Sequence, residues 1–214
     1  IPAADDIVQA SMNAIGKKED RDKIQNLVSV ADCISPRGKY STEMHTASGG
    51  YSYFKQVYSF KPMAFEAVVE KKDKGYIIGD TLSPLSKEMI AMVRGHEFYN
   101  ILLEADKRFH AFEQPLQPDS GTTKLYQVKA KDELENECIL FFEQETGRLS
   151  AIHSRNPADP TEIIEISFSS WQAQQGFTLP RQVTIKQGNQ YYTFDFVKVL
   201  FNSPGFKKRA ALSP

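Results

Sequence analysis

One short pattern contains the residue types that metalloproteases use. His96 and Glu97 begin the His-Glu-x-x-His pattern of zinc proteases, but position 100 is Asn, so the second histidine ligand is missing. No metal-ligand spacing links the remaining histidines, which are His45, His110 and His153. We therefore predict no metal site and interpret each histidine as exposed or satisfied by a hydrogen bond.

The two cysteines, Cys33 and Cys138, each lie in an apolar stretch that predicts a β-strand. They are compatible with one disulfide or with two buried thiols. The apolar neighbours favour buried thiols, because free cysteine behaves as a small hydrophobe. Cys138 and His153 could meet across a hairpin, but nothing near them indicates an activated thiolate.

The other patterns that indicate catalysis are also missing. The sequence contains no nucleophile elbow, phosphate loop or dinucleotide fingerprint. We therefore predict that the protein is not an enzyme and uses no cofactor. An enzyme acting on a hydrophobic substrate is the least favoured alternative.

Charge and composition exclude two further classes of partner. The formal net charge is −1, so no global field gathers nucleic acid or an anionic membrane. No apolar run approaches the roughly 18 residues that a membrane-spanning helix needs. The chain opens at Ile1-Pro2, and from this we expect a mature N-terminus from which a signal peptide was removed, or an acylated cysteine just upstream.

The first half predicts a helix, then strands, then a helix pair. Ile7, Val8, Met12 and Ile15 share one face of a helix over Asp5–Ile15, and Gly16 is predicted to end it in the left-handed conformation. Apolar alternation then predicts strands at Leu27–Ile34, Lys39–Thr46, Tyr51–Phe60, Met63–Glu70 and Gly75–Gly79. Ser83 and Pro84 are expected to begin a helix as cap and first residue, and a second helix is expected after Gly95.

The second half, from Thr122 to Asn202, predicts about six successive strands. Gly188-Asn189, between two apolar runs, indicates a two-residue hairpin. Strands joined by such short turns can only pair antiparallel, because a parallel pair needs a long crossover. No linker divides the chain, so we predict one mainly β domain of the α+β class over 1–214, with 203–214 as a flexible tail.

Several local patterns, in their order along the chain, resemble one known family. They are Ala-Asp-Asp-Ile-Val with Asn-Ala-Ile-Gly at 4–16, Glu-Thr-Gly at 145–147, Gly-Phe-Thr-Leu-Pro at 176–180, and the aromatic strand Tyr191–Val199. Together they resemble the outer-membrane lipoprotein carrier (LolA-like) superfamily, in particular its lipoprotein-sorting-like proteins. The resemblance implies an open antiparallel half-barrel, here of about eleven strands, with helices covering the concave face. It also implies an arginine that locks the helical cover, for which Arg94, Arg108 and Arg181 are candidates by type.

The resemblance further implies a periplasmic or outer-membrane-associated protein that binds a lipid or a lipoprotein acyl chain. Such a site needs no charged motif, because burying eight methylenes is worth roughly 6 kcal/mol before the costs of association. The predicted lining comprises inward strand positions and helical faces: Phe54, Tyr58, Phe65, Met89, Met92, Phe98, Phe141, Ile166, Phe168, Phe194 and Phe196. The alternative is an envelope sensor or protein-interaction domain on the same fold, with these residues as ordinary core.

Overall fold

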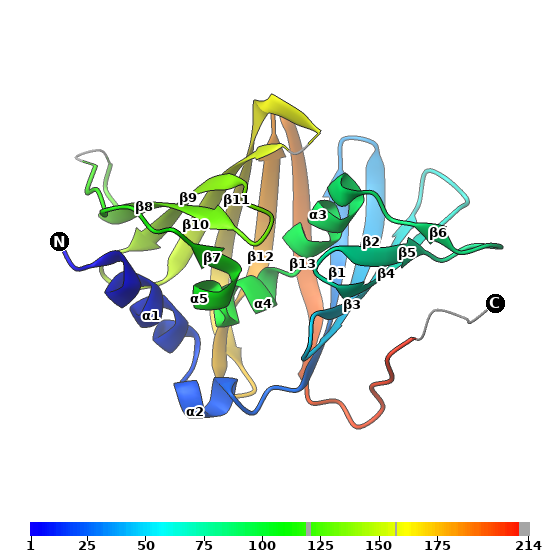
Figure 1. Cartoon of the computed structure of the whole chain (residues 1–214), viewed down its shortest axis with the longest axis horizontal. Helices are drawn as coiled ribbons and strands as arrows, with labels where there is room; N and C mark the ends of the chain where they lie inside the picture. The colour runs from blue at the N-terminus through cyan, green and yellow to red at the C-terminus, as the bar shows by residue number, and fades with distance from the viewer. Residues whose placement is uncertain (119–120, 157, 210–214) are drawn as a thin grey trace. The chain divides into compact units, whose positions relative to one another are not determined.

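The computed structural model describes residues 1–118, 121–156 and 158–209. Within these residues thirteen strands form one sheet in the order β6-β5-β4-β3-β2-β1-β13-β12-β11-β10-β9-β8-β7 (Figure 1). The two end strands, β6 and β7, are not neighbours, so the sheet is open. The predicted open antiparallel sheet is confirmed, with thirteen strands in place of about eleven. Two of them, β6 (Ser83–Pro84) and β7 (Phe109–His110), are only two residues long.

The described chain divides into two compact units, and the prediction of a single domain stays a prediction. The first unit combines Ile1–Asp22 with Phe98–Tyr191. Besides β7 it contains α1 (Ala4–Ile15), α2 (Lys18–Arg21), α4 (Phe98–Leu103), α5 (Ala105–Arg108), β8 (Leu125–Asp132), β9 (Glu137–Glu143), β10 (Leu149–Asn156), β11 (Asp159–Gln174) and β12 (Phe177–Gln187).

The second unit combines Lys23–Glu97 with the chain from Tyr192 onward. Besides β6 it contains β1 (Asn26–Ser35), β2 (Gly38–Ala47), β3 (Tyr51–Tyr58), β4 (Phe65–Lys71), β5 (Lys74–Ile77), α3 (Lys87–Gly95) and β13 (Gln190–Phe201), whose first two residues belong to the first unit. Alternation is clearest in β2, where Tyr40, Thr42, Met44 and Thr46 are buried and the residues between them are not. This face is the one that the sequence predicts.

Helix α1 packs against α4, α5 and strand β12 in the first unit. Its predicted apolar face is confirmed, because Ile7, Val8, Met12 and Ile15 are all buried. The prediction that Gly16 adopts a left-handed conformation is wrong, since its φ is 180° and its backbone is extended. Glycine is required at position 16 because there is no room for a side chain: a Cβ there would lie 2.4 Å from Cδ1 of Phe177.

The helix predicted to begin at Ser83-Pro84 begins later. Ser83 and Pro84 form strand β6, which pairs with Tyr76 and Ile77 at the edge of the sheet. Proline is tolerated on an edge strand because no neighbouring strand needs a hydrogen bond from the backbone N–H that proline lacks. The N-cap of α3 is instead Ser86, whose Oγ accepts a hydrogen bond from the backbone N–H of Met89 at 3.2 Å.

Candidate apolar binding site

Seven of the eleven predicted lining residues lie in the second unit. The strand register places its predicted aromatic residues on one face, because Phe54 is paired with Met44, Tyr58 with Tyr40, and Phe65 with Gln56. Phe194 and Phe196 join this face on β13, where they are paired with Cys33 and Ala31. These five residues therefore form part of one continuous apolar surface.

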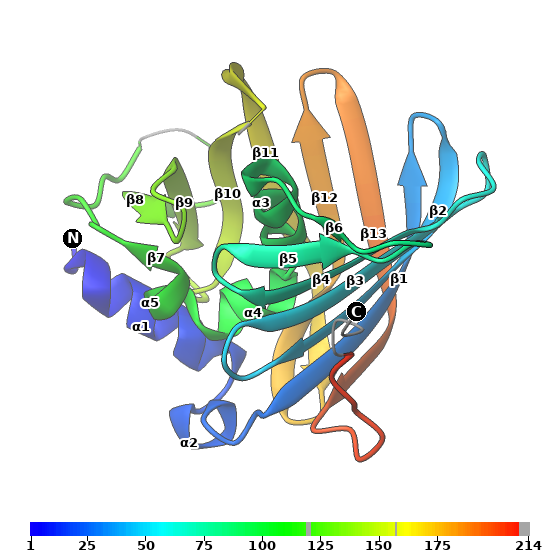
Figure 2. The ribbon, with the colours of Figure 1, turned by 45° about the vertical axis from the view of Figure 1, so that its right-hand side comes forward.

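Helix α3 packs on this surface over β3 and β4 (Figure 2). Ile90 and Val93 of the helix share one buried cluster with Phe54, Ala67 and Met44. Phe54 and Val93 are 0% exposed, so the centre of the contact is closed. The partly buried hydrophobic residues around this cluster are Phe65, Ile77, Met89 and Met92.

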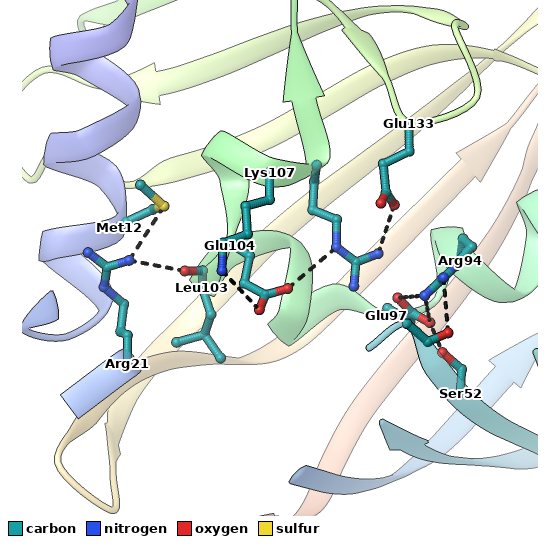
Figure 3. Close-up of polar contacts among 11 residues, drawn as sticks. Met12, Arg21, Ser52, Arg94, Glu97, Leu103, Glu104, Lys107 and Glu133 are labelled. Carbon is teal, nitrogen blue, oxygen red and sulfur yellow. Dashed lines mark hydrogen bonds and ion pairs between the residues drawn. The ribbon is translucent and has the colours of Figure 1, made fainter. Parts of the chain in front are cut away.

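A buried polar network fixes the C-terminal end of α3 to strand β3. The Arg94 guanidinium donates from Nη1 to Oε1 and Oε2 of Glu97 at 3.1 and 3.2 Å, and from Nη2 to the carbonyl oxygen of Gly50 at 3.1 Å. Glu97 is 1% exposed, and it also accepts a hydrogen bond from the hydroxyl of Ser52 (Figure 3). We call these four residues the Arg94 network.

The Arg94 network is the feature that sequence reasoning missed. From sequence, Arg94 is one of three arginines that could lock the helical cover, and Glu97 is only part of an incomplete protease pattern. The available signal was the three-residue spacing of Arg94 and Glu97, which places opposite charges on one helical face. Nothing in the sequence indicates that Ser52 lies beside them.

The other two arginines lie in the first unit. Arg108 is buried and donates from Nη1 to Oε2 of Glu133 at 3.2 Å, which ties α5 to the turn after β8 (Figure 3). Its Nε also lies 3.7 Å from Oε2 of Glu104. Arg181 is exposed on β12. Arg94, in contrast, joins the end of α3 to β3, the strand that carries Phe54, through the hydrogen bonds of the Arg94 network.

The His96 side chain lies within the apolar face and has a hydrogen-bond partner there. Its ring contacts the rings of Phe54 and Phe194, with centroids 5.1 and 5.6 Å away. Its Nδ1 lies 2.7 Å from the carbonyl oxygen of Met92. Burial lowers the pKa of His96 below its ordinary value, which keeps the ring neutral at pH 7.

The remaining four predicted residues lie in the first unit, where one of them is misplaced. The rings of Phe98 and Phe168 meet edge to face at 6.4 Å, and Ile166 shares the face of Phe168. Phe141 is paired with Ala151, which is paired with Ser167, so Phe141 lies on the opposite face. Its ring instead contacts His153, with centroids 4.5 Å apart. Phe141 is therefore removed from the apolar lining.

The groups considered for catalysis are separated or inert. Cys33 and Cys138 are both free and buried, which confirms the thiol interpretation. Burial raises the pKa of Cys33 to about 11 and that of Cys138 to about 12, so neither is a thiolate at pH 7. Cys138 is paired with Ser154, and the neighbouring His153 therefore points to the other face of β10. In the part of the chain that the structure describes, no group of three His, Cys, Asp or Glu side chains could hold a metal ion.

Solved structures of the same fold are found despite low sequence identity. A LolA superfamily protein from Nitrosomonas europaea has a TM-score of 0.66 at 9% identity, over 95% of each chain. A DUF1329 family protein from Desulfovibrio piger has a TM-score of 0.64 at 11% identity, over 97% of this chain and 96% of the other. A domain assigned to the outer membrane lipoprotein-sorting proteins of Vibrio parahaemolyticus has a TM-score of 0.59 at 9% identity, over 94% of each chain.

These likenesses show that the chain has the LolA-like fold. No protein-family model and no curated protein matches the sequence. None of the helices in the described ranges is long and apolar enough to cross a membrane.

Proposed function

We propose that the protein is a non-enzymatic component of the bacterial envelope, periplasmic or associated with the outer membrane, that binds a lipid or a lipoprotein acyl chain. The observation that supports this proposal most directly is the methionine-bearing face of α3 on the aromatic face of the second unit. Methionine side chains suit a flexible apolar ligand because they adapt their shape. The fold shared with a lipoprotein-sorting domain supports the same class of ligand and the same compartment.

The closed packing under α3 determines how a ligand would enter. Phe54 and Val93 leave no exposed surface, so an acyl chain must lie at the border formed by Phe65, Met89 and Met92, or α3 must move away from the strands. Eight buried methylenes are worth roughly 6 kcal/mol, which is enough to replace several apolar contacts of the helix. The Arg94 network opposes this movement, because it joins α3 to Gly50 and Ser52.

The proposal is tested by displacement of a fluorescent fatty acid and by native mass spectrometry of the purified protein. We expect saturable displacement, and lipid that remains bound through purification. The double variant Met89→Gln/Met92→Gln should weaken binding about tenfold, because it places two polar amides at the border of the cluster. Met63→Gln is the matched control, because Met63 is 77% exposed.

The kinetics of the same assay test the role of the helix. Arg94→Met should speed fatty acid uptake, since α3 then moves without breaking the bonds to Glu97 and Gly50. Absence of saturable binding in the parent protein would refute the carrier proposal. Equal affinities for the Met89/Met92 and Met63 variants would refute the assignment of the ligand to this face.

A second function is favoured by the packing itself. The centre of the contact between α3 and the strands is already filled, as in an envelope sensor or protein-interaction domain whose apolar face is core. In that case Met89→Gln/Met92→Gln would lower the free energy of unfolding and no lipid would be found with the purified protein. The two measurements together separate the two functions.

A further inference from the structure

The second unit has a pocket on the face of its sheet that α3 does not cover. Val28 of β1 is paired with Leu200 of β13 and with His45 of β2, and His45 is paired with Tyr53 of β3. These residues therefore form one row across four strands. Val30, paired with Lys198 and Glu43, forms the next row on the same face. This face is opposite to that of Phe54 and Met44, so the pocket is separate from the proposed acyl site.

Residues Ser203–Arg209, which follow β13, lie over this face. The Phe206 ring contacts His45 and Tyr51, with centroids 6.0 and 6.3 Å away. The backbone N–H of Arg209 donates to the hydroxyl of Tyr51 at 2.6 Å, and its guanidinium lies 4.2 Å from the centre of the Tyr53 ring. The sequence predicts this segment to be flexible, but its contacts show that 203–209 forms one wall of the pocket; 210–214 lie outside the described residues.

The pocket has a volume of about 470 Å³, within the range typical of small-molecule sites. Its floor is apolar, with Val28, Val30 and Leu200, and its aromatic walls come from Tyr51, Tyr53 and Phe206. The remaining charged lining is mostly cationic, with Lys198, Lys207, Lys208 and Arg209 against the single carboxylate of Glu43, and His45 lies beside that carboxylate.

The polar side chains of the pocket differ in whether they already have a partner. Glu43 lies 2.5 Å from Nε2 of His45, and Arg209 pairs with Glu66 at 3.3 Å. Lys198, Lys207 and Lys208 are exposed, and none of them has an ion pair within the described part of the chain. Three ammonium groups without an ion pair among the described residues therefore line an apolar and aromatic pocket, and that of Lys208 lies 5.7 Å from the centre of the Tyr51 ring.

We propose that this pocket binds an amphiphilic anion, a molecule with a phosphate or carboxylate head and a short apolar body. The head would contact the three lysines through charge-assisted hydrogen bonds. The body would lie on the valines and Leu200 and replace water there. Because Ser203–Arg209 forms one wall, the bound ligand also holds this segment against the sheet.

Decyl phosphate, decanoate, inorganic phosphate and 1-decanol separate the contributions of head and body. Calorimetric titration should show binding of decyl phosphate, decanoate or both, with inorganic phosphate and decanol at least about tenfold weaker. Amide NMR shifts should change around Val30, His45 and Phe206 and not around Ile90. Inorganic phosphate as tight as decyl phosphate, or decanol as tight as both amphiphiles, would overturn the proposal.

The variant Lys198→Gln/Lys207→Gln/Lys208→Gln should weaken decyl phosphate binding about tenfold, the sum of three modest ionic contacts. Lys72→Gln/Lys87→Gln/Lys124→Gln changes the net charge equally at exposed lysines that do not line the pocket, and it should leave the affinity within about twofold. Equal losses in the two variants would overturn the assignment of the site. Met89→Gln/Met92→Gln should leave these NMR shifts unchanged, so this proposal and the carrier proposal fail independently.

Discussion

The Arg94 network predicts a strong and non-additive effect on stability. Replacing Arg94 with methionine removes the cation that forms an ion pair with the Glu97 carboxylate, which is 1% exposed. Breaking a buried ion pair in this way typically costs about 3–5 kcal/mol. The side chain of Arg94 is only 12% exposed, so solvent screening reduces this figure little. We therefore expect Arg94→Met to lower the free energy of unfolding by about 3–5 kcal/mol.

The double variant Arg94→Met/Glu97→Leu should recover part of that loss. Replacing a buried pair by apolar residues of similar size is often neutral or stabilising, because both desolvation costs disappear. Two groups would still lose a partner in the double variant, namely the Gly50 carbonyl and the Ser52 hydroxyl, at about 1–3 kcal/mol each at most. A net cost of about 2 kcal/mol is therefore expected, less than that of Arg94→Met alone.

The assay is urea unfolding of the parent protein, both single variants and the double variant, analysed as a double-mutant cycle. Tryptophan fluorescence reports Trp171 in the first unit, and far-UV circular dichroism reports the whole chain. We expect a coupling energy of about 2 kcal/mol or more between Arg94 and Glu97. Additive single-variant costs, or a cost below about 1 kcal/mol for Arg94→Met, would refute the reasoning that the pair is buried and mutually dependent.

Three further predictions concern other sites in the chain. Gly16→Ala should cost about 1–3 kcal/mol in urea unfolding, because its Cβ meets the Phe177 ring, and the cost should shrink in a Phe177→Leu background. Burial keeps His96 neutral in the folded protein, whereas in the unfolded chain its side chain binds a proton near pH 6.5. The free energy of unfolding should therefore fall as the pH drops below 6.5. The variant His96→Gln should flatten this fall, as measured by thermal unfolding at a series of pH values. The pKa values of Cys33 and Cys138 are raised, so a thiol reagent at pH 8 should react roughly 100-fold more slowly with the native protein than with the protein unfolded in urea. Fast labelling of the native protein would contradict the burial of both thiols.

Local patterns in the amino-acid sequence predict the order of the elements and most of their faces. Alternation over β2, the amphipathic pattern of α1 and the Gly188-Asn189 hairpin are local signals, because each depends on neighbours within a few residues. Short turns with no helical crossover then allow only antiparallel pairing. These signals are sufficient to predict the antiparallel pairing of the strands, whereas the open half-barrel is implied by the resemblance to the LolA-like superfamily.

Where a strand is apolar on both faces, its pairing with neighbouring strands sets which residues lie on which face. Strand β9 contains Ile139, Leu140, Phe141 and Phe142, so it is apolar on both faces and its period of two cannot choose between them. Pairing with β10, including a bulge between Leu149 and Ala151, places Phe141 on the face of His153. The choice depends on register across strands, which single-strand patterns do not contain.

The polar network and the pocket of the second unit also depend on long-range contacts. Ser52 meets Glu97 across 45 residues, and Tyr51 meets Arg209 across 158. In sequence, Ser203–Arg209 is a polar and basic segment with a single aromatic residue, which predicts a free tail. The Phe206 ring contacts His45 and Tyr51 because β13 pairs with β1. The segment that follows β13 therefore lies on the face of the sheet that helix α3 leaves uncovered.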